Sequence, residues 1–162
     1  MSEHLVAGGP TLEVLKKIGM NAGLDDLAVT GVEPIVDARQ AIEERKARGL
    51  HAGMTFTYGN AERATDPSQL FEGARSVLVG IRRYQPPSAM AQQTRQAAHN
   101  QRSRAVGSVA AYVSSDEYGL LREGLEAIAA HLETFGAHAE VVMDDNRLAD
   151  RAVASKSGLG WL

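Results

Sequence analysis

The sequence predicts a single domain of the α/β class, built as an α+β sandwich in which helices flank a mixed sheet. Two observations lead to this fold class. Segments with apolar residues at helical spacing alternate along the chain with short runs rich in β-branched residues. The chain also has 162 residues, 44% of them hydrophobic and 23% charged, which is typical of one globular domain.

Four segments are expected to form helices, because apolar residues recur in them at intervals of three and four positions. Thr11 is the expected N-cap of the first helix, and Pro34 and Gly49 are expected to open and end the second. The third helix carries the clearest apolar stripe, and Asp145 or Asn146 is expected to cap the fourth. These helices are expected over residues 11–20, 34–48, 115–135 and 147–156.

Three short apolar runs are expected to form the strands of the sheet, at residues 27–32, 76–81 and 140–143. Residues 51–70 are interrupted by Gly and Pro, and we expect them to be mostly irregular. The third apolar run stops directly before Asp144, so an acidic side chain is expected at the C-terminal end of a strand.

Charge and composition exclude several classes of protein. The formal net charge of -3 gives the molecule no bulk attraction for polyanions. The chain has no cysteine, which excludes disulfides, thiolate zinc sites, cysteine nucleophiles and iron-sulfur ligation within these residues. No apolar run approaches the roughly 20 residues of a membrane span, and the N-terminus lacks the features of a signal peptide. We therefore expect a cytoplasmic protein without a membrane partner.

A long stretch without any acidic residue runs from Gly73 to Ser115. One interpretation is a solvated surface loop or short helix. The other is a local positive surface that binds an anionic ligand on an otherwise acidic protein. The arginines of this stretch are Arg75, Arg82, Arg83, Arg95, Arg102 and Arg104.

Asp144 is the residue that points most directly to chemistry. An acid at the C-terminal end of a strand faces the ligand crevice in many open α/β sheets. A carboxyl group in that position can donate or accept a proton, with a pKa set by burial and neighbouring charges. The alternative is a helix cap, a role for which Asp145 and Asn146 compete. Spacing alone leaves both interpretations open.

Two arginines are further candidates for binding. Arg63 precedes the turn at Asp66–Pro67, where its guanidinium group could reach a ligand or bond to loop carbonyls. Arg151 lies on the last expected helix, where it could bind a phosphate, pair with an acid or remain a surface charge. The five histidines form neither an HxH nor an HExxH pattern, and no GxGxxG or P-loop motif is present.

Several segments, taken in order, resemble the N-terminal half of the epoxyqueuosine reductases, which are cobalamin- and iron-sulfur-dependent enzymes of tRNA modification. The most characteristic segment is "GLHAGMTFTYGNAERATDPSQLFEGARSVLVGIRRYQP". The segment "DEYGLLREGLEAIAAHL" is similar to a helix of that family. The segment "DDNRLADRAVASKSGLGW" is similar to its catalytic strand, helix and Gly-Leu-Gly-Trp turn. The resemblance implies a cobalamin-binding catalytic domain.

The resemblance also implies roles for individual residues. Asp144 corresponds to the family's proposed proton donor, next to the cobalamin and the epoxide carbons. Arg63 corresponds to a cobalamin contact, and the region around Ala110 corresponds to another cobalamin-facing segment. Arg151 corresponds to a position associated with tRNA.

Some positions depart from the family's pattern. Gly119 stands where the family often has His, and Ala111 stands where Arg is common. Residues 145–147, Asp-Asn-Arg, replace a smaller and more neutral run. These differences place the chain in a divergent branch.

The resemblance predicts that residues 1–162 form one domain, truncated before a C-terminal part with two 4Fe-4S clusters. The complete enzyme is expected to be a monomer that reduces epoxyqueuosine in tRNA to queuosine with electrons from an external donor. Two other functions remain open. One is a corrinoid-binding module without catalysis, either a carrier or a degenerate relative. The other is a cobalamin-free RNA-binding domain that uses the arginine-rich stretch.

Overall fold

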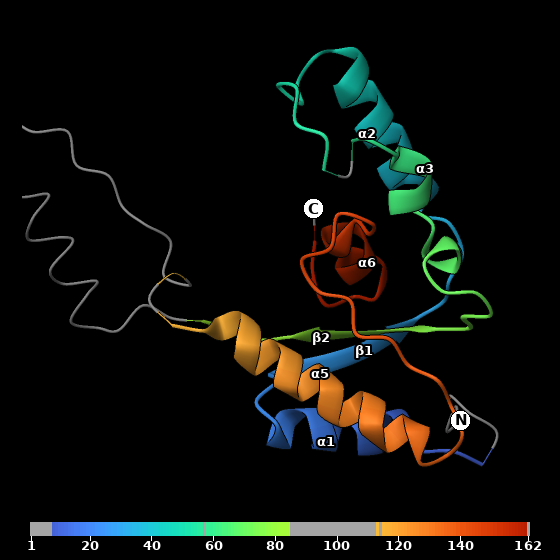
Figure 1. The fold of residues 1–162 in the computed structure, drawn as a ribbon, viewed down its shortest axis with the longest axis vertical. Coiled ribbons are helices and arrows are strands. Elements are labelled where there is room, and N and C mark those ends of the chain that lie inside the picture. Colours follow the sequence, from blue (N-terminus) through green and yellow to red (C-terminus); the bar gives the residue numbers. More distant parts are fainter. Residues whose placement is uncertain (1–7, 57, 85–112, 114, 162) are drawn as a thin grey trace, which may run out of the picture.

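The computed structural model describes residues 8–56, 58–84, 113 and 115–161. Helices and strands follow one another through the described residues, as the α/β prediction expects (Figure 1). None of the described helices is long and apolar enough to span a bilayer. The elements are α1 (Leu12–Asn21), β1 (Asp26–Thr30), α2 (Val36–Ala47), α3 (Ala61–Ala64), η1 (Pro67–Gln69), β2 (Val77–Ile81), α5 (Glu117–Glu133) and α6 (Asp150–Lys156).

The sheet of the described residues is one antiparallel pair, β1 with β2, in place of the expected mixed sheet. Both strands lie within or close to the ranges expected from the sequence, and they pair Leu27 with Gly80 and Val29 with Leu78. The strand expected at 140–143 is wrong, because these residues have no regular secondary structure. Asp144 therefore does not lie at the end of a strand.

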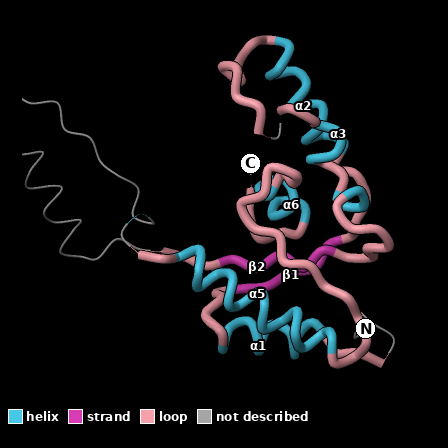
Figure 2. Tube along the Cα trace, viewed as in Figure 1, coloured by secondary structure: helices cyan, strands magenta, loops and turns pink. Residues whose placement is uncertain are grey.

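The main hydrophobic core lies between this sheet and the two helices α1 and α5, which cover one of its faces (Figure 2). Leu27 and Leu78 both pack into this core, since paired or alternate residues of an antiparallel pair point to the same face. The buried residues of the core are Leu15, Leu24, Leu27, Ile128 and Leu132.

Three glycines allow the two helices to approach the sheet closely around Leu24. A Cβ atom on Gly19 of α1, Gly80 of β2 or Gly124 of α5 would lie within 3 Å of the Leu24 side chain. Leu24 is only 4% exposed, so its side chain fills the space that the three missing Cβ atoms leave. Through the Leu24 side chain, the helices α1 and α5 therefore pack closely against β2.

The helix α6 lies on the other side of the sheet, and α2 with α3 projects beyond it (Figure 1). The backbone N–H of Ala149, just before α6, donates to the carbonyl of Ala64 at the end of α3 over 2.7 Å. At its other end, the Lys156 ammonium group donates to the backbone carbonyls of Gly31 and Glu33. Segments from three distant parts of the sequence therefore meet at α6.

The helix ends confirm some of the expected signals and correct others. Thr11 caps α1 by accepting from the Val14 N–H, as expected. Gly49 follows the end of α2 with a φ of +71°, a conformation that favours glycine. Pro34, however, does not open α2, which begins at Val36. No residue of α2 is buried.

Candidate functional site

The acidic segment before α6 forms a turn and not the end of a strand. The Asp145 carboxylate accepts from both the backbone N–H and the Nε of Arg147, over 2.8 and 2.7 Å. Arg147 also pairs with Glu140 at 3.3 Å, so the turn is tied back to the preceding segment. Asp144 has a φ of +50°, in the left-handed region that Asp tolerates better than most residues. This turn directs the chain into α6.

The expected capping of the last helix by Asp145 or Asn146 is wrong. The helix α6 begins three residues later than expected, at Asp150, and its N-cap position is Ala149, which makes no side-chain capping bond. Asp145 uses its carboxylate for the turn with Arg147, and Ala149 donates its N–H to Ala64. The contact with α3 therefore fixes the start of α6.

A buried polar contact positions α3, and with it Arg63. The hydroxyl of Thr65, a fully buried residue, donates to the Ala61 carbonyl over 2.8 Å and accepts from Arg39 of α2. The Asn60 side chain caps α3 by accepting from the backbone N–H of Arg63 over 3.0 Å. These bonds fix the conformation of α3 and its position against α2. The pKa of Asp145 is lowered mainly by its hydrogen bonds from Arg147 and to a small extent by the charge of Arg63.

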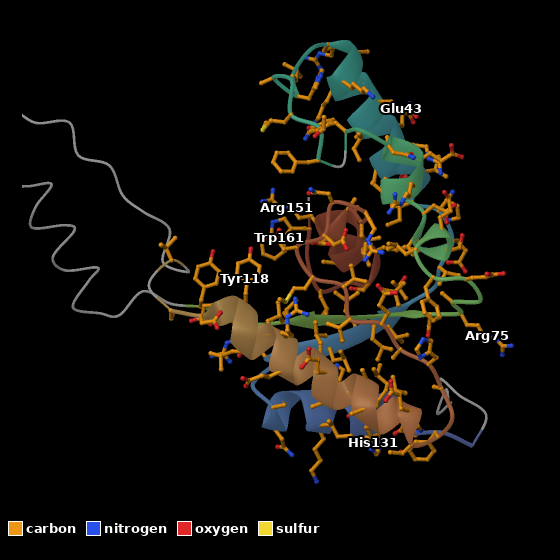
Figure 3. All side chains as sticks on the ribbon, in the orientation of Figure 1. Glu43, Arg75, Tyr118, His131, Arg151 and Trp161 are labelled. Atoms are coloured by element: carbon orange, nitrogen blue, oxygen red, sulfur yellow. The ribbon has the colours of Figure 1, made fainter. Side chains whose placement is uncertain are left out.

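The structure brings some of the expected site residues together and not others. Arg63 and the turn at Asp144 meet through the bond between Ala64 and Ala149, and both side chains are exposed. Arg151 is exposed on α6, and Figure 3 shows it on the same side of the molecule as Trp161. Ala110 lies outside the described residues. Asp144 lies in the turn before α6, and the charge of Arg63 acts on its neighbour Asp145.

Sequence analysis missed Asp150, whose carboxyl group has the most altered pKa described. Loss of hydration and, to a smaller extent, the negative charges of Asp144 and Asp145 together raise this pKa to about 6. The Asp150 residue keeps contact with solvent at its surface, but protein atoms around the carboxyl group remove part of its water. The sequence places three aspartates, Asp144, Asp145 and Asp150, within seven residues. This spacing could have indicated repulsion between like charges.

Two acids before and at the start of α6 have pKa values shifted in opposite directions. Hydrogen bonds from Arg147 hold the pKa of Asp145 below its ordinary value, so this carboxyl group stays ionised. The pKa of Asp150 is raised to about 6, because the protein removes part of its hydration and two carboxylates lie nearby. The surface can therefore hold and release a proton near neutral pH, a property suited to acid–base chemistry.

Only Arg75, Arg82 and Arg83 of the acid-free stretch lie among the described residues, so the positive-surface interpretation stays a prediction. Arg82 pairs with Glu117 at 2.9 Å and also donates to the carbonyl of Gly23, so it joins β2 to the start of α5. Arg75 lies at the opposite edge of the molecule from Arg151 (Figure 3). Arg95, Arg102 and Arg104 lie outside the described residues. The described residues also contain no cluster of three or more His, Cys, Asp or Glu side chains that could hold a metal ion.

The chain matches curated epoxyqueuosine reductases from several organisms. It is 23% identical to that of Cyclobacterium marinum over 154 residues, which cover 92% of this chain and 46% of that protein. It is 26% identical to that of Bacillus cereus over 142 residues and 27% identical to that of Staphylococcus aureus over 143 residues. Each of the latter two matches covers 86% of this chain, and they cover 35% and 36% of those proteins.

The extent of these matches defines the relationship. The chain spans less than half the length of these curated relatives. No family model matches it, and no solved structure matches it. At 23–27% identity the relationship is distant, but it covers most of the chain, including both the Arg63 and the Asp144 segments. The chain is therefore a distant relative of the epoxyqueuosine reductases.

Proposed function

We propose that this chain is part of an epoxyqueuosine reductase-like oxidoreductase that reduces epoxyqueuosine in tRNA to queuosine. The name of its relatives supports the reaction class. The observation that supports a site is the hydrogen bond from Ala149 to Ala64, which joins the end of α3, next to Arg63, to the start of α6. Arg63, Asp144 and Asp150 are all exposed, so they are available to a ligand.

The cofactor in this proposal is cobalamin. The Arg63 guanidinium has no ion-pair partner among the described residues and is exposed, so it can donate to the amide carbonyls or the phosphate of a corrinoid. The exposed carboxylate of Asp144 can accept from amide N–H groups of the same ligand. Arg63 and Asp144 would hold the cofactor, together with the segment around Ala110. When bound, the corrinoid supplies reducing chemistry that no side chain of this chain provides.

The residues of the chain supply protons and orientation. Reduction of an epoxide to an alkene and water takes two electrons and two protons, and we assign the donation of one proton to the Asp144 carboxyl group. Arg151 is proposed to contact tRNA, where a guanidinium binds phosphate oxygens. The electrons come from an external donor. The 4Fe-4S clusters stay predicted for a part of the protein outside these 162 residues.

Replacement of Asp144 by Asn in the full-length protein tests the proton-donor role. The amide keeps the size of the side chain but holds no transferable proton, so we expect turnover of epoxyqueuosine tRNA to fall about 10²- to 10⁴-fold. Binding of cob(II)alamin, followed by its visible spectrum, should persist. Asp37→Asn, in the first turn of α2, is the matched control.

The outcomes separate the candidate functions. Normal turnover by the Asp144→Asn variant, with cobalamin bound, would show that another group donates the proton. If the unaltered full-length protein binds cobalamin but reduces no tRNA with any reductant supplied, it is the non-catalytic corrinoid-binding module. If cobalamin does not bind at all while tRNA does, the RNA-binding alternative replaces both.

A further inference from the structure

A second candidate site lies on the projecting part of the molecule, between α2 and the chain that follows it. An open pocket of about 580 Å³ is formed there, and it shares no residue with the surface around Arg63 and Asp144. Figure 1 shows the chain leaving the end of α2 and turning back beside the helix. The pocket is lined by Ala41, Glu44, Arg45, Arg48, Leu50 and Tyr58.

Helical spacing explains one wall of the pocket. Residues 41, 44, 45 and 48 are separated by three, one and three positions, so their side chains share one face of α2. This face carries charged residues in place of an apolar stripe, which agrees with the absence of buried residues in α2. The wall is therefore available to a ligand and is not covered by the core.

Leu50, just after the end of α2, lines another side of the pocket. The N–H of Leu50 donates to the Arg45 carbonyl and the N–H of Gly49 donates to the Lys46 carbonyl, both over 3.0 Å. These two bonds, with Gly49 in the left-handed conformation, form a Schellman motif. The motif fixes Leu50 beside the last turn of α2. Leu50 is 57% exposed, so an apolar surface lines the pocket entrance.

The loop after this motif returns Tyr58 to the helix. The N–H of Met54 donates to the His51 carbonyl over 2.9 Å, which tightens the loop. The rings of His51 and Tyr58 lie 5.7 Å apart at an angle of 40°. Packing against His51 restricts the Tyr58 ring, which is half-buried and lines the pocket. A flat, preoriented aromatic surface is thereby presented to the pocket.

The charges of the pocket leave one guanidinium group without compensation. Arg48 pairs with Glu44 at 3.2 Å, within the same helix. In the part of the chain that the structure describes, Arg45 has no ion pair. The pocket thus combines a free cation, a phenol ring and an apolar side chain. The Glu44 carboxylate is neutralised by Arg48, so it repels an anion less strongly.

We propose that this pocket binds a nucleotide, with the phosphate on Arg45 and the base against Tyr58. A guanidinium group matches the geometry of a phosphate, and aromatic side chains stack on any base. The pocket volume lies within the usual range of about 300–1,000 Å³ for small-molecule sites. The ligand is either a free mononucleotide or a nucleotide within a single-stranded RNA. The proposal goes beyond the reductase function and needs no cobalamin.

Calorimetry with a matched pair of ligands tests the phosphate contact. Adenosine 5′-monophosphate carries the phosphate, and adenosine lacks it. We expect the unaltered chain to bind the monophosphate about tenfold more tightly, the usual size of a charge-assisted contact. Arg45→Gln should abolish this preference without changing adenosine binding. Arg122→Gln, which replaces an exposed arginine of α5, should keep it.

Two variants of Tyr58 test the stacking contact. Tyr58→Phe keeps the ring and should bind both ligands, whereas Tyr58→Leu should lose both. A ten-nucleotide adenosine RNA then identifies the source of the ligand. Tighter binding of the RNA than of the monophosphate, lost in Arg45→Gln, assigns the pocket to an RNA strand. Equal or weaker binding of the RNA assigns it to a free nucleotide.

Either of two results would overturn the proposal. One is the absence of saturable binding of monophosphate and RNA to the unaltered chain, a measurement that needs no variant. The other is an unchanged preference for the monophosphate in Arg45→Gln. Circular dichroism of each variant verifies its fold, and Arg45 makes no ion pair whose loss would disturb α2.

Discussion

At the scale of single residues, the acidic turn shows how identical side chains acquire different roles. Asp145 is bound by Arg147 through two hydrogen bonds and remains ionised. Asp150 has no such partner among the groups that alter its pKa, and the two neighbouring carboxylates oppose its ionisation. Asp144, the residue singled out from the sequence, is exposed.

Asp150→Asn should change the pH dependence of stability. The pKa of Asp150 is about 6 in the folded chain and near 3.8 when unfolded, so the folded state retains a proton that the unfolded state releases. Its contribution to stability is present below pH 4 and is lost as the pH rises through 6. We expect Asp150→Asn to be about 1 kcal/mol more stable than the unaltered chain at pH 8, after allowance for solvent screening.

Urea unfolding followed by circular dichroism at pH 4, 6 and 8 measures this difference. Asp37→Asn is the control, because Asp37 lies on α2, away from the acidic turn. The same stability gain at pH 4 as at pH 8 would contradict the assignment, because the Asp150 carboxyl group is already protonated at the lower pH.

At the scale of elements, the sequence predicted where helices form more reliably than it predicted which elements they pack against. The apolar stripe of α5 is buried against α1 and the sheet, as helical periodicity predicts. No residue of α2 is buried, and among the described contacts Arg39 connects α2 to Glu62 of α3 and to Thr65. Periodicity identifies a face that can be buried, but the presence of a covering element depends on the rest of the chain.

Gly124→Ala should destabilise the fold, although alanine is ordinarily the better helix former. On an exposed helix this change stabilises by about 1 kcal/mol. Here, the new Cβ atom would lie 2.6 Å from Cγ of Leu24, so α5 must move away from the sheet. We expect a net loss of about 1–3 kcal/mol in the free energy of unfolding, measured with urea.

The double variant Leu24→Ala with Gly124→Ala provides the control for this steric explanation. Removal of the Leu24 side chain leaves room for the new Cβ atom, so the two changes together should cost less than the sum of each alone. Strictly additive losses would indicate that Gly124 acts through the backbone and not through contact with Leu24.

At the scale of the whole molecule, the two sides of the sheet are held together in different ways. The layer of α1, β1, β2 and α5 shares the main core. On the other side of the sheet, α6 buries Ala152 and Val153, outside the main core. Hydrogen bonds at its two ends also connect Ala149 to Ala64 and Lys156 to Glu33.

Amide hydrogen exchange should show this division directly. Local opening requires less free energy where few apolar groups are buried, so α2 should exchange faster than α5 at the same pH and temperature. We expect the protection of α5 amides to approach that of the global unfolding reaction. Protection of α2 equal to that of α5 would show that the projecting part belongs to the main cooperative unit.

The sequence by itself determined the local structure, because local signals act over a few residues. Spacing and side-chain chemistry predicted the Thr11 cap, the glycine at position 49 after α2, the apolar stripe of α5 and the two strands β1 and β2. Two candidate residues, Arg63 and Asp144, were also named from the sequence, and both are exposed.

The tertiary structure alone decided which segments meet. Residues 140–143 have the composition of a strand but do not pair, since a strand also needs a neighbour with free backbone groups. The Asp150 pKa depends on carboxylates placed by a turn that Arg147 holds, and the pocket beside Arg45 depends on the return of Tyr58. The hydration of a carboxyl group, the repulsion between carboxylates and the enclosure of a pocket all depend on distances in space. Separation along the chain does not specify these distances.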